Sequence, residues 1–77
     1  PLQQDEEARI MLDKSRSGML CRAKMTIRAH EATIEVDSYG RIVYEIENLG
    51  RRLVLVEWEG DSSLFVFPSE IEVESEG

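Results

Sequence analysis

The chain has few of the residues that staple small proteins or perform chemistry in them. Its 77 residues include a single cysteine, Cys21, and a single histidine, His30. One cysteine excludes an internal disulfide and any metal site built from several cysteines. The scarcity of cysteine also favours a reducing compartment.

Long hydrophobic runs are missing as well. A membrane-spanning helix needs about 20 mainly apolar residues, and no stretch of this sequence approaches that length. The first seven residues, PLQQDEE, lack the basic start and apolar run of a secretory signal peptide. We therefore expect a cytoplasmic protein without a membrane span.

Basic residues are scarce in the second part of the chain. The formal net charge is −7. Residues 1–28 carry six Lys/Arg and four Asp/Glu, a balance of +2, whereas residues 29–77 carry three and twelve, a balance of −9. A field of this sign repels phosphate backbones, so nucleic acid is disfavoured as a partner.

The composition that is present is that of one small globular domain. Hydrophobic residues make up 42% of the chain and charged residues 32%, as in folded rather than disordered proteins. A chain this short buries only about 60% of its unfolded surface, so self-association into a homo-oligomer would add useful burial. We expect an N-terminal arm over residues 1–18, a β domain over 19–74 and a disordered tail over 75–77.

The arm is predicted to hold a short helix from Asp5 to Ser15. Asp5 is a candidate N-cap, and the two glutamates after it lie in the first turn, where the helix dipole favours anions. Ala8, Met11 and Leu12 share one face at i, i+3, i+4 spacing.

From Leu20 the hydrophobic period changes to two, which predicts a strand to Ala29. Its apolar face would hold Cys21, Ala23, Met25, Ile27 and Ala29, and its other face Arg22, Lys24, Thr26 and Arg28. A long, partly extended loop follows over residues 30–37.

Four further extended segments are predicted, at residues 41–46, 52–58, 63–67 and 71–73. Ile42, Tyr44 and Ile46 would share one face of the first of these. Turn chemistry separates them at residues 38–40, 47–50 and 60–62, and residues 68–70 should form a tight 3₁₀ turn after Pro68 ends its strand. Short strands joined by turns indicate a small antiparallel barrel, with Cys21, Met25, Ile27, Val54, Val56 and Trp58 pointing inward.

Three stretches resemble small bacterial SH3-like barrel proteins: GRIV at 40–43, LVLVEWEG at 53–60 and FVFPSEIEV at 65–73. The resemblance covers residues 40–73 and implies a mainly β, five-stranded antiparallel SH3-like barrel. The chain is also similar in size and ending to the SH3-like subunits that dock ferredoxin on the photosynthetic NADH dehydrogenase-like complex, which implies docking of an acidic redox protein as an alternative. A helix followed by five bent strands is, in addition, the order of the ring-forming, RNA-binding Sm-like fold.

Candidate catalytic and metal sites are weak. Cys21 could act as a nucleophile, but it lies on the apolar side of its strand and more simply packs there as a small hydrophobe. His30 beside Glu31 lacks the partners of a triad or of a metal site. The acidic run Glu70, Glu72, Glu74 and Glu76 has two interpretations, a divalent cation site and a charged strand edge that resists aggregation. We therefore expect no enzymatic activity and no cofactor.

The basic row Arg22, Lys24 and Arg28 also has two interpretations. It could pair with the protein's own carboxylates on the closing strand, or it could dock an acidic partner. We predict a non-enzymatic protein-interaction module, with an Sm-like nucleic-acid-binding barrel or a redox-docking subunit as alternatives. The candidate partner-binding residues are Arg22, Lys24, Arg28, His30, Tyr39, Arg51 and Arg52.

Overall fold

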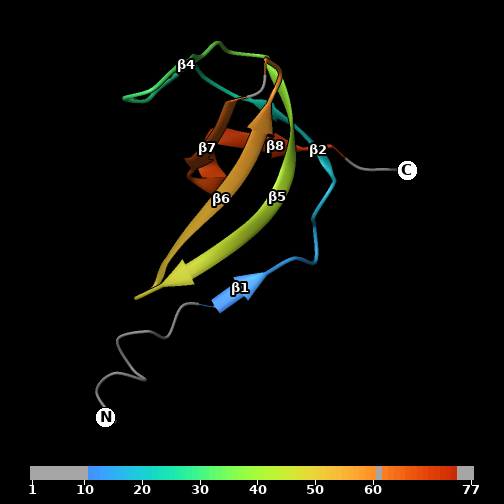
Figure 1. Cartoon of the computed structure of the whole chain (residues 1–77), viewed down its shortest axis with the longest axis vertical. Helices are drawn as coiled ribbons and strands as arrows, with labels where there is room; N and C mark the ends of the chain where they lie inside the picture. Colours follow the sequence, from blue (N-terminus) through green and yellow to red (C-terminus); the bar gives the residue numbers. More distant parts are fainter. Residues whose placement is uncertain (1–10, 61, 75–77) are drawn as a thin grey trace, which may run out of the picture.

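The computed structural model describes residues 11–60 and 62–74, and these form a mainly β structure. The elements are β1 (Met11–Asp13), β2 (Leu20–Ala23), β3 (Ile27–Arg28), β4 (Thr33–Ile34), β5 (Tyr39–Asn48), β6 (Arg51–Trp58), β7 (Ser62–Val66), the 3₁₀ turn η1 (Pro68–Glu70) and β8 (Ile71–Val73). One antiparallel sheet has the order β7-β6-β5-β2-β8, and β1 also pairs with β5 (Figure 1). Strands β3 and β4 form a separate two-stranded sheet.

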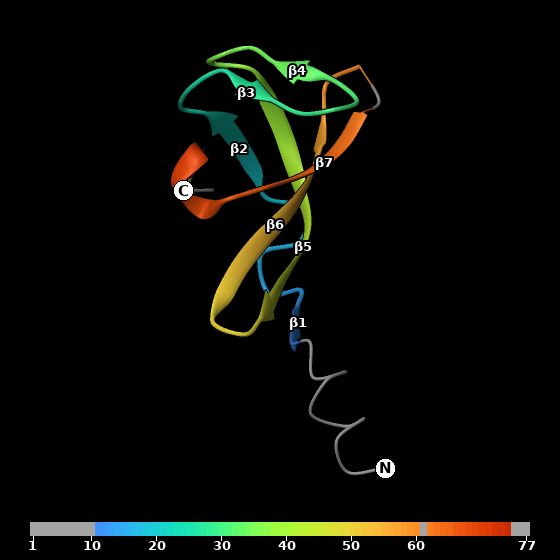
Figure 2. The ribbon, with the colours of Figure 1, turned by 90° about the vertical axis from the view of Figure 1, so that its left-hand side faces the viewer.

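The long β5–β6 hairpin organises the molecule. It extends beyond the other strands at one end, where β1 lies beside β5, while β3 and β4 lie at the opposite end (Figure 2). Its turn has positive φ at Leu49 (55°) and Gly50 (80°), the pair of left-handed residues that a two-residue hairpin requires. The sequence predicted a turn at residues 47–50, and its two left-handed residues are Leu49 and Gly50.

The predicted N-terminal helix is wrong for residues 11–15. Met11, Leu12 and Asp13 are extended and lie opposite Glu47, Ile46 and Glu45 of β5. A helix of this length is marginal by itself, whereas pairing with β5 gives the same residues partners along a strand. Residues 5–10 of the predicted helix lie outside the described residues.

The predicted strand from Leu20 to Ala29 is interrupted. After Ala23 the backbone N–H of Lys24 donates to the carbonyl of Glu70, 2.9 Å away, and the chain leaves the sheet. The chain becomes extended again at β3, which pairs with β4. Strand β4 lies within residues 30–37, which were predicted to form a loop. Met25 falls in the interruption and is 46% exposed, so its predicted inward position is wrong.

The core lies on the inner side of the main sheet. The other five residues predicted to point inward, Cys21, Ile27, Val54, Val56 and Trp58, are all buried, together with Ala23, Ile34, Ile42, Leu64, Val66 and Ile71. The predicted 3₁₀ turn is confirmed: the Glu70 N–H donates to the Phe67 carbonyl, and the Phe67 N–H donates to the Glu70 carboxylate, both at 2.9 Å. Within the described residues, no helix has the length and hydrophobicity that a membrane crossing requires.

Candidate functional site

An irregularity in β5 decides which side chains face outward. Ile42 lies opposite Val56, but Tyr44 lies opposite Leu55, so Val43 is an extra residue with no partner on β6. An extra residue reverses the alternation of a strand. Ile42 is therefore in the core while Tyr44 and Ile46 lie on the outer side, and the prediction that these three share one face is wrong.

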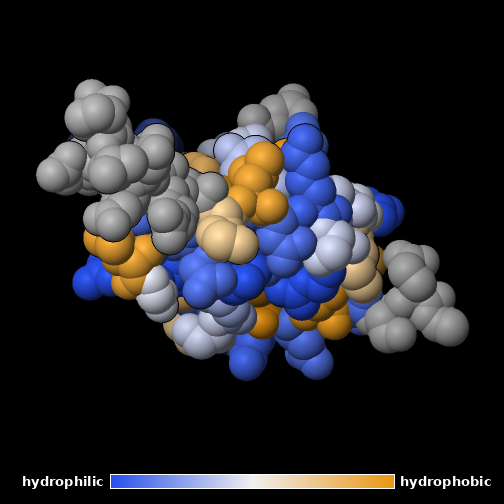
Figure 3. All heavy atoms as spheres, turned by 90° about the horizontal axis from the view of Figure 1, so that it is seen from below, coloured by the Kyte–Doolittle hydropathy of each residue, from blue (hydrophilic) through white to orange (hydrophobic). Residues whose placement is uncertain are grey.

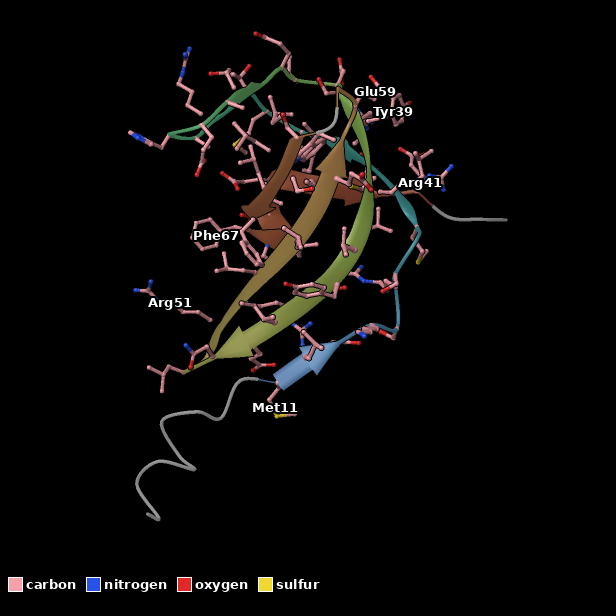
Figure 4. The ribbon with its side chains drawn as sticks, viewed as in Figure 1. Met11, Tyr39, Arg41, Arg51, Glu59 and Phe67 are labelled. Atoms are coloured by element: carbon pink, nitrogen blue, oxygen red, sulfur yellow. The ribbon has the colours of Figure 1, made fainter. Side chains whose placement is uncertain are left out.

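The outer side of the sheet carries two apolar rows. Directly opposite residues of an antiparallel pair lie on the same face, so the registers place Tyr44, Leu55 and Phe65 in one row. They place Leu12, Ile46 and Leu53 in the next row. The extended backbone at Phe67 continues the alternation beyond Phe65, and Figure 4 shows the Phe67 ring projecting away from the strands. We call these seven residues the outer apolar face.

Part of the outer apolar face is open to solvent. Leu12, Phe65 and Phe67 are 56%, 46% and 50% exposed. The rings of Tyr44 and Phe65 meet in an edge-to-face arrangement across β6, with centroids 6.3 Å apart, a favourable geometry for two aromatic rings. Seen from below the molecule, hydrophobic side chains interrupt a mainly hydrophilic surface (Figure 3).

A shallow hollow of about 350 Å³ lies at the end of the outer side where β5 begins and β6 ends. It is lined by Leu20, Tyr39, Gly40, Arg41, Glu57, Trp58, Glu59 and Gly60. Tyr39 is 40% exposed, so its aromatic ring is accessible at the edge of the hollow. Trp58, which also lines the hollow, is buried and belongs to the core. Tyr39, Arg41 and Glu59 lie together at this end of the molecule in Figure 4.

Gly40 allows core side chains to pack closely against the backbone beside the hollow. A Cβ atom at this position would lie 2.6 Å from Cγ1 of Val56, 2.9 Å from the Glu57 carbonyl oxygen and 2.9 Å from Cε3 of Trp58. No side chain fits there without displacing its neighbours. The buried side chains of Val56 and Trp58 therefore pack directly against the β5 backbone at this point.

The charges on the rim of the hollow are of both signs. Arg41 donates from Nη1 to the carbonyl of Gly18 at 2.9 Å, which holds its side chain along the surface. Glu57 lies opposite Arg41 in the β5–β6 register, and both it and Glu59 are exposed. The rim therefore combines an aromatic ring with charges of both signs.

Arg22 belongs to an internal network of charges. Its guanidinium contacts Asp37 at 2.7 Å, Glu72 at 2.5 Å and Glu74 at 3.6 Å. Asp37, followed by Glu72, raises the pKa of Arg22. Arg22 therefore pairs with the protein's own carboxylates on and after β8, the first of the two interpretations of the basic row.

Lys24 and Arg28 lie outside that network. The break after Ala23 removes them from the strand that holds Arg22, so the three do not form one row. Neither side chain forms an ion pair with a carboxylate in residues 11–60 or 62–74. Arg28 is on β3 and the exposed His30 lies in the connection to β4, and these two strands lie at the end of the molecule opposite β1 (Figure 2).

Arg51 and Arg52 lie at the opposite end, beside the β5–β6 turn (Figure 4). Arg52 turns to the inner side, where it contacts Glu45 at 2.9 Å, Glu47 at 3.1 Å and Asp13 at 3.4 Å. Arg51 is exposed and, within the described residues, has no carboxylate partner. The structure therefore does not bring the predicted basic residues together.

Glu45 is the centre of a buried charge cluster that the sequence did not reveal. Its side chain is 2% exposed and accepts from Nε and Nη2 of Arg16, at 2.7 and 3.0 Å, and from Arg52. The hydrogen bond from Arg16, followed by that from Arg52, lowers the pKa of Glu45 against the opposing effect of burial. The shift of phase at Val43 turns this glutamate inward, and no local sequence pattern indicated that shift.

The residues considered for catalysis do not form a reactive group. Cys21 is buried, and burial raises its pKa to about 11, which keeps the thiol protonated and poorly nucleophilic near neutral pH. Among the described residues no three Cys, His, Asp or Glu side chains are arranged to hold a metal ion. The indole N–H of Trp58 is buried without a hydrogen-bond partner in the described part of the chain.

Comparison with known proteins adds no relative. No protein-family model matches the chain. No curated protein and no solved structure gives a significant match either.

Proposed function

We propose that this chain is a non-enzymatic protein-interaction module with an SH3-like barrel fold, acting in the cytoplasm. The sheet order supports the fold: β8 lies beside β2, the first strand of the body, and the 3₁₀ turn η1 directly precedes β8. This arrangement agrees with the resemblance in residues 40–73.

The observation that carries the function is the hollow around Tyr39. It combines an accessible aromatic ring, a floor supported by the core and a rim with both signs of charge. Aromatic side chains supply much of the binding energy in protein interfaces. The partner in this proposal is a protein that inserts a side chain beside Tyr39.

The predicted residues Lys24, Arg28 and His30 extend the surface at this end. Exposed charges of this kind guide association more than they hold the complex together. Arg22 and Arg52 already pair within the protein, so we assign them no contact with the partner. Arg51, at the other end, is outside this surface as well.

Affinity capture from native lysate tests the proposal when three immobilised forms are compared. A Tyr39→Ser, Glu59→Lys variant should lose the proteins that the wild type retains. A matched control, Asn48→Lys, Leu49→Ser at the β5–β6 turn, should retain them, because it removes an exposed apolar side chain and adds positive charge at the opposite end of the molecule. Identical retained proteins for all three forms would refute this placement of the site.

A further inference from the structure

The two rows of the outer apolar face carry apolar side chains at matching positions on neighbouring strands. The row of Leu55 holds Tyr44 on β5 and Phe65 on β7. The row of Leu53 holds Ile46 on β5 and, by the alternation after Phe65, Phe67 beyond β7. Strands β5 and β6 and the segment from Phe65 to Phe67 thus each present one bulky apolar side chain to each row, and Leu12 of β1 adds one more to the Leu53 row.

We infer that two copies of this chain pair through the outer apolar face about a two-fold axis. The axis lies between the two facing sheets and runs parallel to them. It crosses the strands at right angles at the level of Val54. This rotation places the Leu55 row of one copy on the Leu53 row of the other, strand by strand. Leu55 then meets Leu53, Tyr44 meets Ile46, and Phe65 meets Phe67, and the same contacts recur on the other side of the axis, as an isologous interface requires.

The charges at the ends of the face are complementary under the same rotation. Beyond the apolar rows on β6, Arg51 ends one side of the face and Glu57 the other. Arg51 is two residues before Leu53, and Glu57 is two residues after Leu55. The rotation that superposes the two rows therefore also brings Arg51 of one copy to Glu57 of the other. Both are exposed and have no ion pair within the described residues.

The net charge of the molecule does not oppose this pairing locally. The registers place three charged residues on the outer side of β5 and β6, namely Arg41, Arg51 and Glu57, a local sum of +1 from two bases and one acid. Glu72 lies on β8, away from the outer apolar face, and the Glu70 carboxylate accepts the backbone N–H of Phe67 at its edge. A face with this balance fits its own copy better than a strongly acidic or basic partner.

The size of the face sets the expected strength. At about 4.8 Å between strands and about 3.3 Å per residue, the face measures about 15 by 20 Å. The area of a face with these dimensions is below the roughly 800 Å² that each partner buries in a standard interface. The dimer should therefore be weak and dependent on concentration. It goes beyond the proposed function and does not depend on it, because Tyr39 lies outside the two rows, although the dimer's Glu57 also borders the hollow.

Sedimentation velocity of the whole chain between about 10 μM and about 1 mM, the range for a weak interface, tests the inference. The wild type should shift from monomer to dimer. Phe65→Ser should reduce the association constant about tenfold or more, with circular dichroism confirming that the fold is kept.

A charge exchange gives a second test that loss of folding cannot imitate. Arg51→Glu alone places Glu against Glu at both ends of the dimer, and Glu57→Arg alone places Arg against Arg, so each variant should dimerise less than the wild type. An equimolar mixture of the two should form a heterodimer, because every end then joins opposite charges. Arg28→Glu on β3 and Glu31→Arg in the β3–β4 connection make the same changes of charge outside the outer apolar face. Neither control should change the association constant.

A wild type that stays monomeric to about 1 mM would overturn the inference, and so would a dimer that Phe65→Ser does not weaken. Failure of the mixture to form a heterodimer would overturn the proposed orientation. None of these results depends on whether Tyr39 binds a partner, so the two proposals can fail separately.

Discussion

Nε of Arg16 lies 2.7 Å from Oε2 of Glu45, although 29 residues separate them in the chain. Arg16 belongs to the turn between β1 and β2, and Glu45 to the part of β5 after the bulge. This pair joins the N-terminal segment to the inner side of the long hairpin. The buried carboxylate of Glu45 thus connects two segments that are far apart in the sequence.

Replacing Glu45 by Gln should lower the free energy of unfolding by about 2–3 kcal/mol, because two guanidinium groups then lose their buried counter-charge. Glu72→Gln, at the exposed pair with Arg22, should cost less than about 0.5 kcal/mol. Urea unfolding followed by Trp58 fluorescence measures both. Equal effects of the two substitutions would show that Glu45 has no special role.

The same cluster predicts a loss of stability in acid. Arg16 and Arg52 hold the pKa of Glu45 below its usual value, so the folded state favours the ionised carboxylate more than the unfolded state does. The stabilisation is complete above the unfolded pKa of about 4.3 and disappears as pH falls through the lower folded pKa. Urea midpoints between pH 7 and pH 3 should fall less in Glu45→Gln than in the wild type, and parallel curves would contradict this.

Gly40→Ala should destabilise the protein by about 1–3 kcal/mol, because the new methyl group meets Val56, Trp58 and the backbone of Glu57. The exposed Ser63→Ala on β7 provides a control that should change stability by less than about 0.5 kcal/mol. Thermal unfolding compares the two variants. A neutral Gly40→Ala would mean that β5 and β6 are less closely packed at this point than described.

Cys21 should resist alkylation in the native protein. Burial raises its pKa to about 11, so at pH 8 the thiolate that iodoacetamide attacks is scarce and inaccessible. The modification rate should rise by orders of magnitude in denaturant, where the pKa returns to about 8.5. Rapid modification without denaturant would instead support a reactive thiol.

The sequence predicted those elements whose cause is local. Alternation identified the extended segments near Cys21 and Val54, Pro68 marked the 3₁₀ turn, and Gly50 marked the hairpin. The predicted helix failed because the apolar spacing of Met11 and Leu12 does not reveal a partner strand more than 30 residues away.

The candidate site depends on long-range features in the same way. Tyr39, a predicted partner-binding residue, is exposed, but the bulge at Val43 has no local signal. That bulge moves Tyr44 outward beside Phe65 and Glu45 inward beside Arg16, so the outer apolar face and the buried charge cluster could not be read from period-two alternation. The break after Ala23, which depends on a hydrogen bond to Glu70, likewise separates Arg22 from Lys24 and Arg28.

The most direct test of the interaction module is photo-crosslinking in native lysate, with p-benzoylphenylalanine placed at position 39 in one protein and at position 49 in another. Position 39 borders the hollow, whereas position 49 is exposed in the β5–β6 turn at the opposite end of the molecule. We predict discrete adducts with another protein from position 39 and none of these from position 49. The same adducts from both positions, or none from position 39, would contradict it.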